Sequence, residues 1–271
     1  MRKYIFEDVN ASLHSIGFSK VFRKDLIKAL EKDQIKKFRN KHFNEITKKY
    51  VIGFRQKVAP SFLENEFIPH IPSAKLIIDV GCGTGALPYR LSKYNRFKKI
   101  IGVDVTQYPE WKLFSNAKTE FIQINPNSLE NILKSFHPDV VTLTWSLHHM
   151  PKINQKSYLQ GIYDALPNEG KVIILEDSYS TKKRPLKGAR TWAKFMRLKP
   201  RERQKVMSML DWVANKVLSG RAKIPMPYSY RTTEEWTKLC ERMGYRVKTR
   251  YFGFPNKRDI NNPQALIQLT K

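Results

Sequence analysis

The sequence predicts an α/β protein built on a mostly parallel sheet with helices on both faces. Two observations carry this prediction. Apolar runs alternate with amphipathic segments from residue 75 to residue 176, and the first run, 76–80, leads into a glycine-rich turn at 81–85. Apolar strands separated by helices are buried on both faces of a sheet. A strand followed by a glycine turn brings bare backbone close to a ligand.

The first part of the chain, residues 1–74, predicts a basic helical cap. Phe22, Leu26 and Leu30 recur at helical spacing, and the periodicity continues as far as residue 54. Ser61 follows Pro60 and stands three residues before Glu64, which predicts a new helix start with a capping box.

The second part, residues 75–271, predicts the sheet domain. We expect strands at 75–80, 99–104, 121–124, 139–144 and 171–176, and helices near 86–94, 128–135 and 153–166. Thr233 is the expected N-cap of a further helix that Gly244 ends. Two last strands, 245–252 and 265–270, are joined by a turn rather than a helix, so we expect them to be antiparallel.

Residues 179–231 interrupt the alternation and predict a helical insertion. Pro200 opens a helix with an apolar stripe, and Gly220 ends it. Met207, Met209 and Trp212 are candidates to line a pocket under this helix, although such a stripe is also typical of plain core.

The charge and composition of the chain limit the functions that it can have. The 271 residues carry a net charge of +26, which lies on the flanks of a nearly neutral segment at 76–178. The dense basic run at 182–205 indicates an anionic partner such as RNA, a membrane surface or a substrate; a solvated lysine-rich surface is the alternative.

No apolar run approaches the roughly 18 residues of a membrane span. Cys82 and Cys240 have no metal-ligand spacing, so we expect a cytoplasmic protein without bound metal.

The glycine turn favours one kind of cofactor. Its spacing is G-x-G-x-G rather than the G-x-G-x-x-G of dinucleotide sites, and Asp79 before it suits a cation better than a pyrophosphate. Asp104 ends the second expected strand, where a carboxylate can accept both hydroxyls of a ribose. A cation and a ribose without a phosphate describe S-adenosylmethionine.

On the turn 79–85, Asp104 and the segments 121–126 and 139–150, the chain resembles the class I S-adenosylmethionine-dependent methyltransferases. The resemblance implies a Rossmann-like three-layer fold with a seven-stranded, mostly parallel sheet. It also implies cofactor-binding roles for Asp79, Gly81, Cys82, Gly83, Gly85, Asp104, Val105, Asn125, Pro126 and Trp145. Asn125 stands where the family usually has an aspartate, so it supplies an acceptor oxygen without a charge.

The resemblance leaves the acceptor open. The loop 144–150 is similar to that of quinone-type and other small-molecule methyltransferases, and it lacks the N/D-P-P-Y/F motif of base N-methyltransferases. His148 or His149 is a candidate to orient or deprotonate the acceptor, and the alternative is that they cap or pack locally. We therefore expect methyl transfer to a small or lipid-like, anionic acceptor. An RNA methyltransferase and a non-catalytic, cofactor-binding assembly protein are the alternatives.

Overall fold

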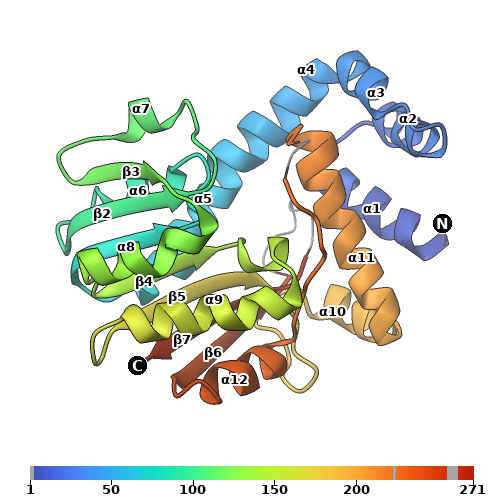
Figure 1. Cartoon of the computed structure of the whole chain (residues 1–271). Coiled ribbons are helices and arrows are strands. Elements are labelled where there is room, and N and C mark those ends of the chain that lie inside the picture. Colours follow the sequence, from blue (N-terminus) through green and yellow to red (C-terminus); the bar gives the residue numbers. More distant parts are fainter. Residues whose placement is uncertain (1–2, 222–223, 255–261) are drawn as a thin grey trace.

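A seven-stranded mixed sheet forms the centre of the computed structural model, which describes residues 3–221, 224–254 and 262–271 (Figure 1). The strand order is β3-β2-β1-β4-β5-β7-β6, and β7 runs antiparallel to the other six strands. The strands are β1 (Ala74–Val80), β2 (Phe97–Asp104), β3 (Thr119–Gln123), β4 (Val140–Thr144), β5 (Lys171–Asp177), β6 (Arg246–Gly253) and β7 (Gln264–Thr270). The predicted fold class is confirmed.

Helices cover both faces of this sheet. On one face, α8 (Leu129–Phe136), α9 (Lys152–Ala165) and α12 (Thr233–Glu241) pack their apolar sides against Ile78 and its neighbours. On the other face, α6 (Ala86–Leu91) and the end of the long N-terminal helix pack against Ile77. Successive strand residues point to opposite faces, which is why the apolar run of β1 supplies both cores.

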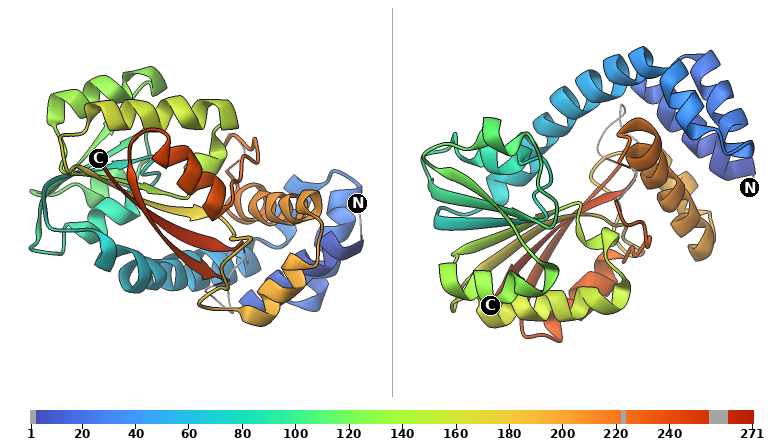
Figure 2. Two further views of the ribbon diagram at one scale, coloured as in Figure 1. Left: turned by 90° about the horizontal axis from the view of Figure 1, so that it is seen from below. Right: turned by 45° about the horizontal axis from the view of Figure 1, so that its top comes forward.

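A third apolar core joins two segments that lie far apart in the sequence. The N-terminal helices α1 (Lys3–Ile16), α2 (Lys20–Glu31) and α3 (Ile35–Lys41) share it with α10 (Ala189–Met196), α11 (Pro200–Trp212) and η6 (Val213–Leu218). Phe22 and Phe38 on the first side and Val206 and Leu210 on the second are buried in it. Figure 2 shows these helices together beside the sheet. The cap and the insertion therefore form one helical layer.

A long helix connects this layer to the sheet. It runs without a break through α4 (Phe43–Ile46), η1 (Thr47–Val58), α5 (Ala59–Phe62) and η2 (Leu63–Phe67), and the turn η3 (Ile68–His70) follows. The predicted helix start at Ser61 is wrong, because Ser61 lies inside this helix and its hydroxyl accepts from Asn65. Pro60 is tolerated because it lies in the first turn of α5, directly after the wide turns of η1 end.

Most other predicted boundaries lie close to the observed ones. The N-cap of α12 is Thr232 rather than Thr233: the Thr232 hydroxyl accepts from the Glu235 N–H at 3.1 Å, and the Glu235 carboxylate accepts from the Thr232 N–H at 2.7 Å. The last strands are antiparallel as predicted. Within the described ranges, no helix combines the length and the apolarity needed to cross a membrane.

Candidate active site

The glycine turn lies at the carboxyl end of β1, with all three glycines in the left-handed region. The φ angles of Gly81, Gly83 and Gly85 are 71°, 53° and 85°. A Cβ atom added to Gly83 would meet nothing within 4 Å, whereas one added to Gly85 would lie 2.5 Å from the Phe121 ring. Gly83 therefore leaves an open cradle for a ligand, and Gly85 is required for packing.

Asp79 is buried directly beneath this turn. Its Oδ1 accepts a hydrogen bond from the Thr142 hydroxyl at 2.7 Å, and its Oδ2 has no hydrogen-bond partner. Burial raises the pKa of Asp79 to about 7. A buried carboxylate oxygen without a partner fits the ammonium group of a cofactor better than any phosphate.

Asp104, at the end of β2, is fixed beside the same turn. Its Oδ2 accepts from the Gly83 N–H at 2.8 Å, and its Oδ1 accepts from the Thr106 N–H at 2.9 Å. Val105 next to it is 53% exposed. Asp79 and Asp104 thus flank the open cradle at Gly83, and these residues fit the amino acid and ribose parts of S-adenosylmethionine.

Trp111 completes the wall of the turn, and the sequence analysis missed it. The helix α7 (Trp111–Phe114) places its indole N–H 2.8 Å from the Gly83 carbonyl oxygen, and the indole stacks on Phe121 with ring centres 5.3 Å apart. Trp111 comes from a loop without a motif, so only its being a tryptophan near the second strand could have drawn attention to it.

The remaining predicted cofactor residues lie around this edge. Asn125 is exposed after β3, and its side-chain oxygen accepts from the Asn127 N–H at 3.1 Å, which caps η4 (Pro126–Ser128). Trp145 has a left-handed φ of 49° and donates from its indole nitrogen to Gln264. Burial raises the pKa of the Cys82 thiol. The Phe121 ring leaves no room for a side chain at Gly102, where a Cβ would lie 2.6 Å from the ring and 3.0 Å from Cys82 Sγ.

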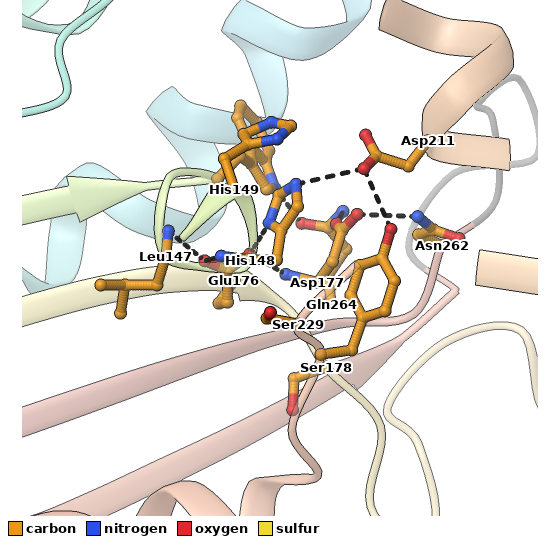
Figure 3. A network of polar contacts seen from close by, with 12 residues as sticks. Leu147, His148, His149, Glu176, Asp177, Ser178, Asp211, Ser229, Asn262 and Gln264 are labelled. Carbon is orange, nitrogen blue, oxygen red and sulfur yellow. Dashed lines mark hydrogen bonds and ion pairs between the residues drawn. The ribbon is translucent and has the colours of Figure 1, made fainter. Parts of the chain in front are cut away.

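His148 is buried between two carboxylates (Figure 3). It belongs to η5 (Leu147–His149), the turn after β4. Its Nδ1 lies 2.5 Å from Glu176 Oε1, and its Nε2 lies 3.6 Å from Asp211 Oδ2. Burial by itself would lower the pKa of His148, but the charges of Glu176 and Asp211 outweigh burial and hold it well above the ordinary value. Glu176 also accepts the backbone N–H groups of Leu147 and His148, which fixes the turn.

His149 differs from its neighbour in environment. Its Nδ1 lies 2.9 Å from the Pro225 carbonyl oxygen, which can only accept, so Nδ1 carries the proton. Burial and the adjacent His148 lower the pKa of His149 to about 4. His149 is therefore a neutral imidazole with an unprotonated Nε2.

A cavity of about 230 Å³ lies between the glycine turn and the helical layer. Ala86, Trp145 and His149 line it from the sheet side, and Arg55 and Arg221 line it from the helical side. Met207, Met209 and Trp212 do not line it: Met207 is fully buried in the helical core, and the other two pack against that core. Of the two interpretations of this stripe, plain core is the one observed, because the polar side of α11 faces the cavity through Asp211.

Four further residues of this site were not predicted from the sequence: Glu176, Asp211, Arg55 and Arg221. Glu176 lies one residue before the end of β5, which is a usable signal for a site at the carboxyl edge of a parallel sheet. The other three come from the cap and the insertion, and no spacing in the sequence relates them to the histidines.

The fold, the open glycine cradle and the two flanking aspartates define a class I S-adenosylmethionine-dependent methyltransferase. The methyltransferase domain family matches residues 51–249, which is most of the chain, so the chain belongs to this family. S-Adenosylmethionine is the cofactor of this class. No curated protein sequence is similar enough to count as a match.

Solved structures show the same fold at low sequence identity. An S-adenosylmethionine-dependent methyltransferase from Archaeoglobus fulgidus is 15% identical over 82% of this chain and 100% of its own, with a TM-score of 0.51. PigF, solved with S-adenosylhomocysteine, is 14% identical over 87% of this chain and 68% of its own, with a TM-score of 0.50. Human N-acetylserotonin methyltransferase in complex with S-adenosylmethionine is 18% identical over 73% of this chain, with a TM-score of 0.46. This chain spans only about half the length of several matched proteins. It covers 48% of the human enzyme and 56% and 57% of two further matched structures.

Proposed function

We propose that this protein transfers the methyl group of S-adenosylmethionine to a small or lipid-like, anionic acceptor bound in the cavity between the glycine turn and the helical layer. The observation that carries the proposal is the composition of the cavity wall. It joins the edge of the glycine turn, at Ala86 and Trp145, to a neutral histidine and three arginines. One of the three, Arg90, pairs with Glu64.

The chain's own residues would hold the cofactor in three places. Asp79 binds the amino group directly or through water, the backbone at Gly81 and Gly83 admits the amino acid part, and Asp104 binds the ribose. The bound cofactor supplies an electrophilic methyl group on a sulfonium. The protein's work is then to orient the acceptor and to exclude water.

Two arginines support an anionic acceptor. Arg221 follows η6, and Arg55 lies on η1; both line the cavity. Burial, and then the charge of Arg55, lower the pKa of Arg221. No carboxylate among the described residues forms an ion pair with either guanidinium. An anionic group on the acceptor would offset the repulsion between these two cations.

His149 is the better candidate for contact with the acceptor. It lines the cavity, and its Nε2 is free to accept a hydrogen bond or a proton from an acceptor hydroxyl or amine. His148 is enclosed by Glu176 and Asp211, so we assign it the role of fixing the turn η5 and pairing with these two carboxylates.

An RNA acceptor is the second candidate, and the exposure of the basic run favours it. Nearly all lysines and arginines of residues 182–205 are exposed on the loop before α10 and along α10 and α11; Arg203 is the buried exception. Binding through several phosphates falls steeply with salt. A salt titration with RNA and with anionic vesicles separates the candidates, because an acceptor bound in the cavity requires neither surface.

The test is an untargeted methylation assay. Labelled S-adenosylmethionine is incubated with the protein and a cell extract, which is then split into metabolite, lipid, RNA and protein fractions. We expect label in the metabolite or lipid fraction and much less of it with Asp104→Ala. Label in RNA would replace the proposal by the second candidate. Cofactor binding without turnover in any fraction would indicate a non-catalytic, cofactor-binding assembly protein.

A further inference from the structure

We propose that His148, His149 and Asp211 bind a divalent transition-metal ion in the acceptor cavity. Each residue offers one ligand atom, and these atoms lie within 4.8 Å of one another. The histidines come from η5 at the sheet edge, and the aspartate comes from α11 in the insertion. All three line the cavity, so the cluster lies where an acceptor would bind.

The two imidazole rings are held in the way that metal ligands require. In each ring Nδ1 is occupied: in His148 it contacts the Glu176 carboxylate, and in His149 it donates to the Pro225 carbonyl oxygen. A metal-binding histidine usually donates its other ring nitrogen to a carboxylate or a backbone carbonyl, which fixes the ring and leaves the remaining nitrogen for the ion. In both rings the nitrogen left over is Nε2, and on His148 an ion would take the place of the Nε2 proton.

The spacing between the rings and the carboxylate also suits an ion. His148 Nε2 and Asp211 Oδ2 are 3.6 Å apart, which is too far for a good hydrogen bond. Two ligands bound to one ion at about 2.1 Å each are separated by roughly 3 to 3.5 Å. Asp211 is itself held in place, because the Tyr230 hydroxyl donates to its Oδ2 at 3.0 Å and the Asn215 amide donates to its Oδ1 at 2.6 Å.

A second feature of the cavity points to a ligand. Asn262 is buried and lines the same cavity, and its Oδ1 has no hydrogen-bond partner while its amide nitrogen donates to Asp177 at 2.8 Å. A lone carbonyl oxygen beside two imidazoles and a carboxylate would accept from water on the ion or from an acceptor held there.

The ligand set selects the kind of ion. Two imidazoles and one carboxylate leave coordination positions open and suit Zn²⁺, Fe²⁺ or Co²⁺ better than Mg²⁺, which prefers oxygen ligands. This last step rests on the proposed function: an open coordination position on the ion would take an oxygen of the acceptor. An ion there would lower the pKa of that oxygen, so the favoured acceptor group is a hydroxyl.

Metal binding can be measured without any acceptor. The untagged full chain is stripped with a chelator and titrated with Co²⁺, whose visible absorption reports the coordination, and Zn²⁺ is then added as a competitor. We expect one Co²⁺ per chain, displacement by Zn²⁺, no displacement by Mg²⁺, and a higher melting temperature with Zn²⁺. His149→Gln is the main variant because His149 is only partly buried, and Asp211→Asn is the second.

The matched control is Asp25→Asn. Asp25 contacts His42 at 3.0 Å, so this variant removes another close histidine–aspartate contact without touching the cavity. Loss of the cobalt spectrum in both cavity variants and its retention in Asp25→Asn is the expected result. A wild type that binds less than one ion in ten chains, or His149→Gln with an unchanged spectrum, overturns the site. Methyl transfer is not part of this readout, so a stoichiometric ion in a protein that methylates nothing would contradict the proposed function alone.

Discussion

Asp104 Oδ2 accepts the backbone N–H of Gly83 at 2.8 Å, which ties the carboxylate at the end of β2 to the middle of the turn after β1. The residue proposed to bind the ribose therefore also shapes the cradle for the amino acid part. A change at Asp104 acts on both parts of the cofactor site.

Asp104→Ala should weaken cofactor binding strongly. The variant loses the acceptor for the ribose hydroxyls and leaves the Gly83 N–H without its partner, and hydrogen bonds to a charged group contribute about 1.5–3 kcal/mol. We expect the dissociation constant of S-adenosylhomocysteine, measured by calorimetry, to rise by about tenfold to a hundredfold. An affinity equal to that of the wild type would contradict the assigned role.

Asp79 should make cofactor affinity depend on pH. Burial raises its pKa to about 7, and only the ionised form pairs with the ammonium group of the cofactor. Below pH 7 the carboxyl group must release a proton on binding, so affinity should fall by about tenfold per pH unit as the pH decreases. Calorimetry at several pH values checks this. Asp79→Asn should bind weakly with no such dependence, and an identical slope in that variant would assign the titration to another group.

Gly83→Ala and Gly85→Ala should separate a ligand cradle from a packing position. Both glycines have positive φ, so each alanine costs about 1–2 kcal/mol of backbone strain. At Gly83 the added methyl group enters open space, whereas at Gly85 it meets the Phe121 ring. We expect Gly83→Ala to lose cofactor affinity, and its unfolding free energy to fall by no more than this strain. Gly85→Ala should lose about 1–3 kcal/mol more in stability from overpacking. Urea denaturation and calorimetry distinguish the two.

His149→Gln should reduce turnover by about a hundredfold or more while cofactor affinity stays unchanged, because His149 lines the acceptor cavity and has no hydrogen bond to the glycine turn. The measurement is single-turnover methyl transfer to the acceptor found in the extract assay. Full turnover in the variant would remove His149 from the reaction. Adding a chelator distinguishes the two roles of His149, general base and metal ligand. A base that acts without an ion keeps its turnover when the ion is removed.

Met207→Ala should destabilise the helical layer rather than alter the acceptor site. Met207 is fully buried between the N-terminal helices and the insertion, and truncation of such a side chain costs about 2–5 kcal/mol. Met209 is only partly buried, so Met209→Ala should cost less and serves as the matched control. Equal losses of unfolding free energy in urea would contradict this packing.

The local pattern of the sequence determined the sheet and its glycine turn, and it predicts the cofactor residues. The reason is that Asp79, Gly81, Gly83 and Asp104 lie within two neighbouring strand–turn units, where strand period and turn chemistry fix their positions. The helix start at Ser61 was predicted wrongly from the same kind of local signal, because packing on the sheet and in the third core favours one long helix over the local cap.

Only the tertiary structure decided which side chains line the cavity beside the glycine turn. Asp211 lies 62–63 residues after the histidine pair, and Arg55 lies in the opposite part of the chain, yet all of them reach one cavity. They meet because apolar side chains of the N-terminal helices and of the insertion are buried against each other, and this burial has no sequence period that spans both segments. The cofactor could therefore be inferred from adjacent residues, whereas the acceptor site depends on contacts between distant ones.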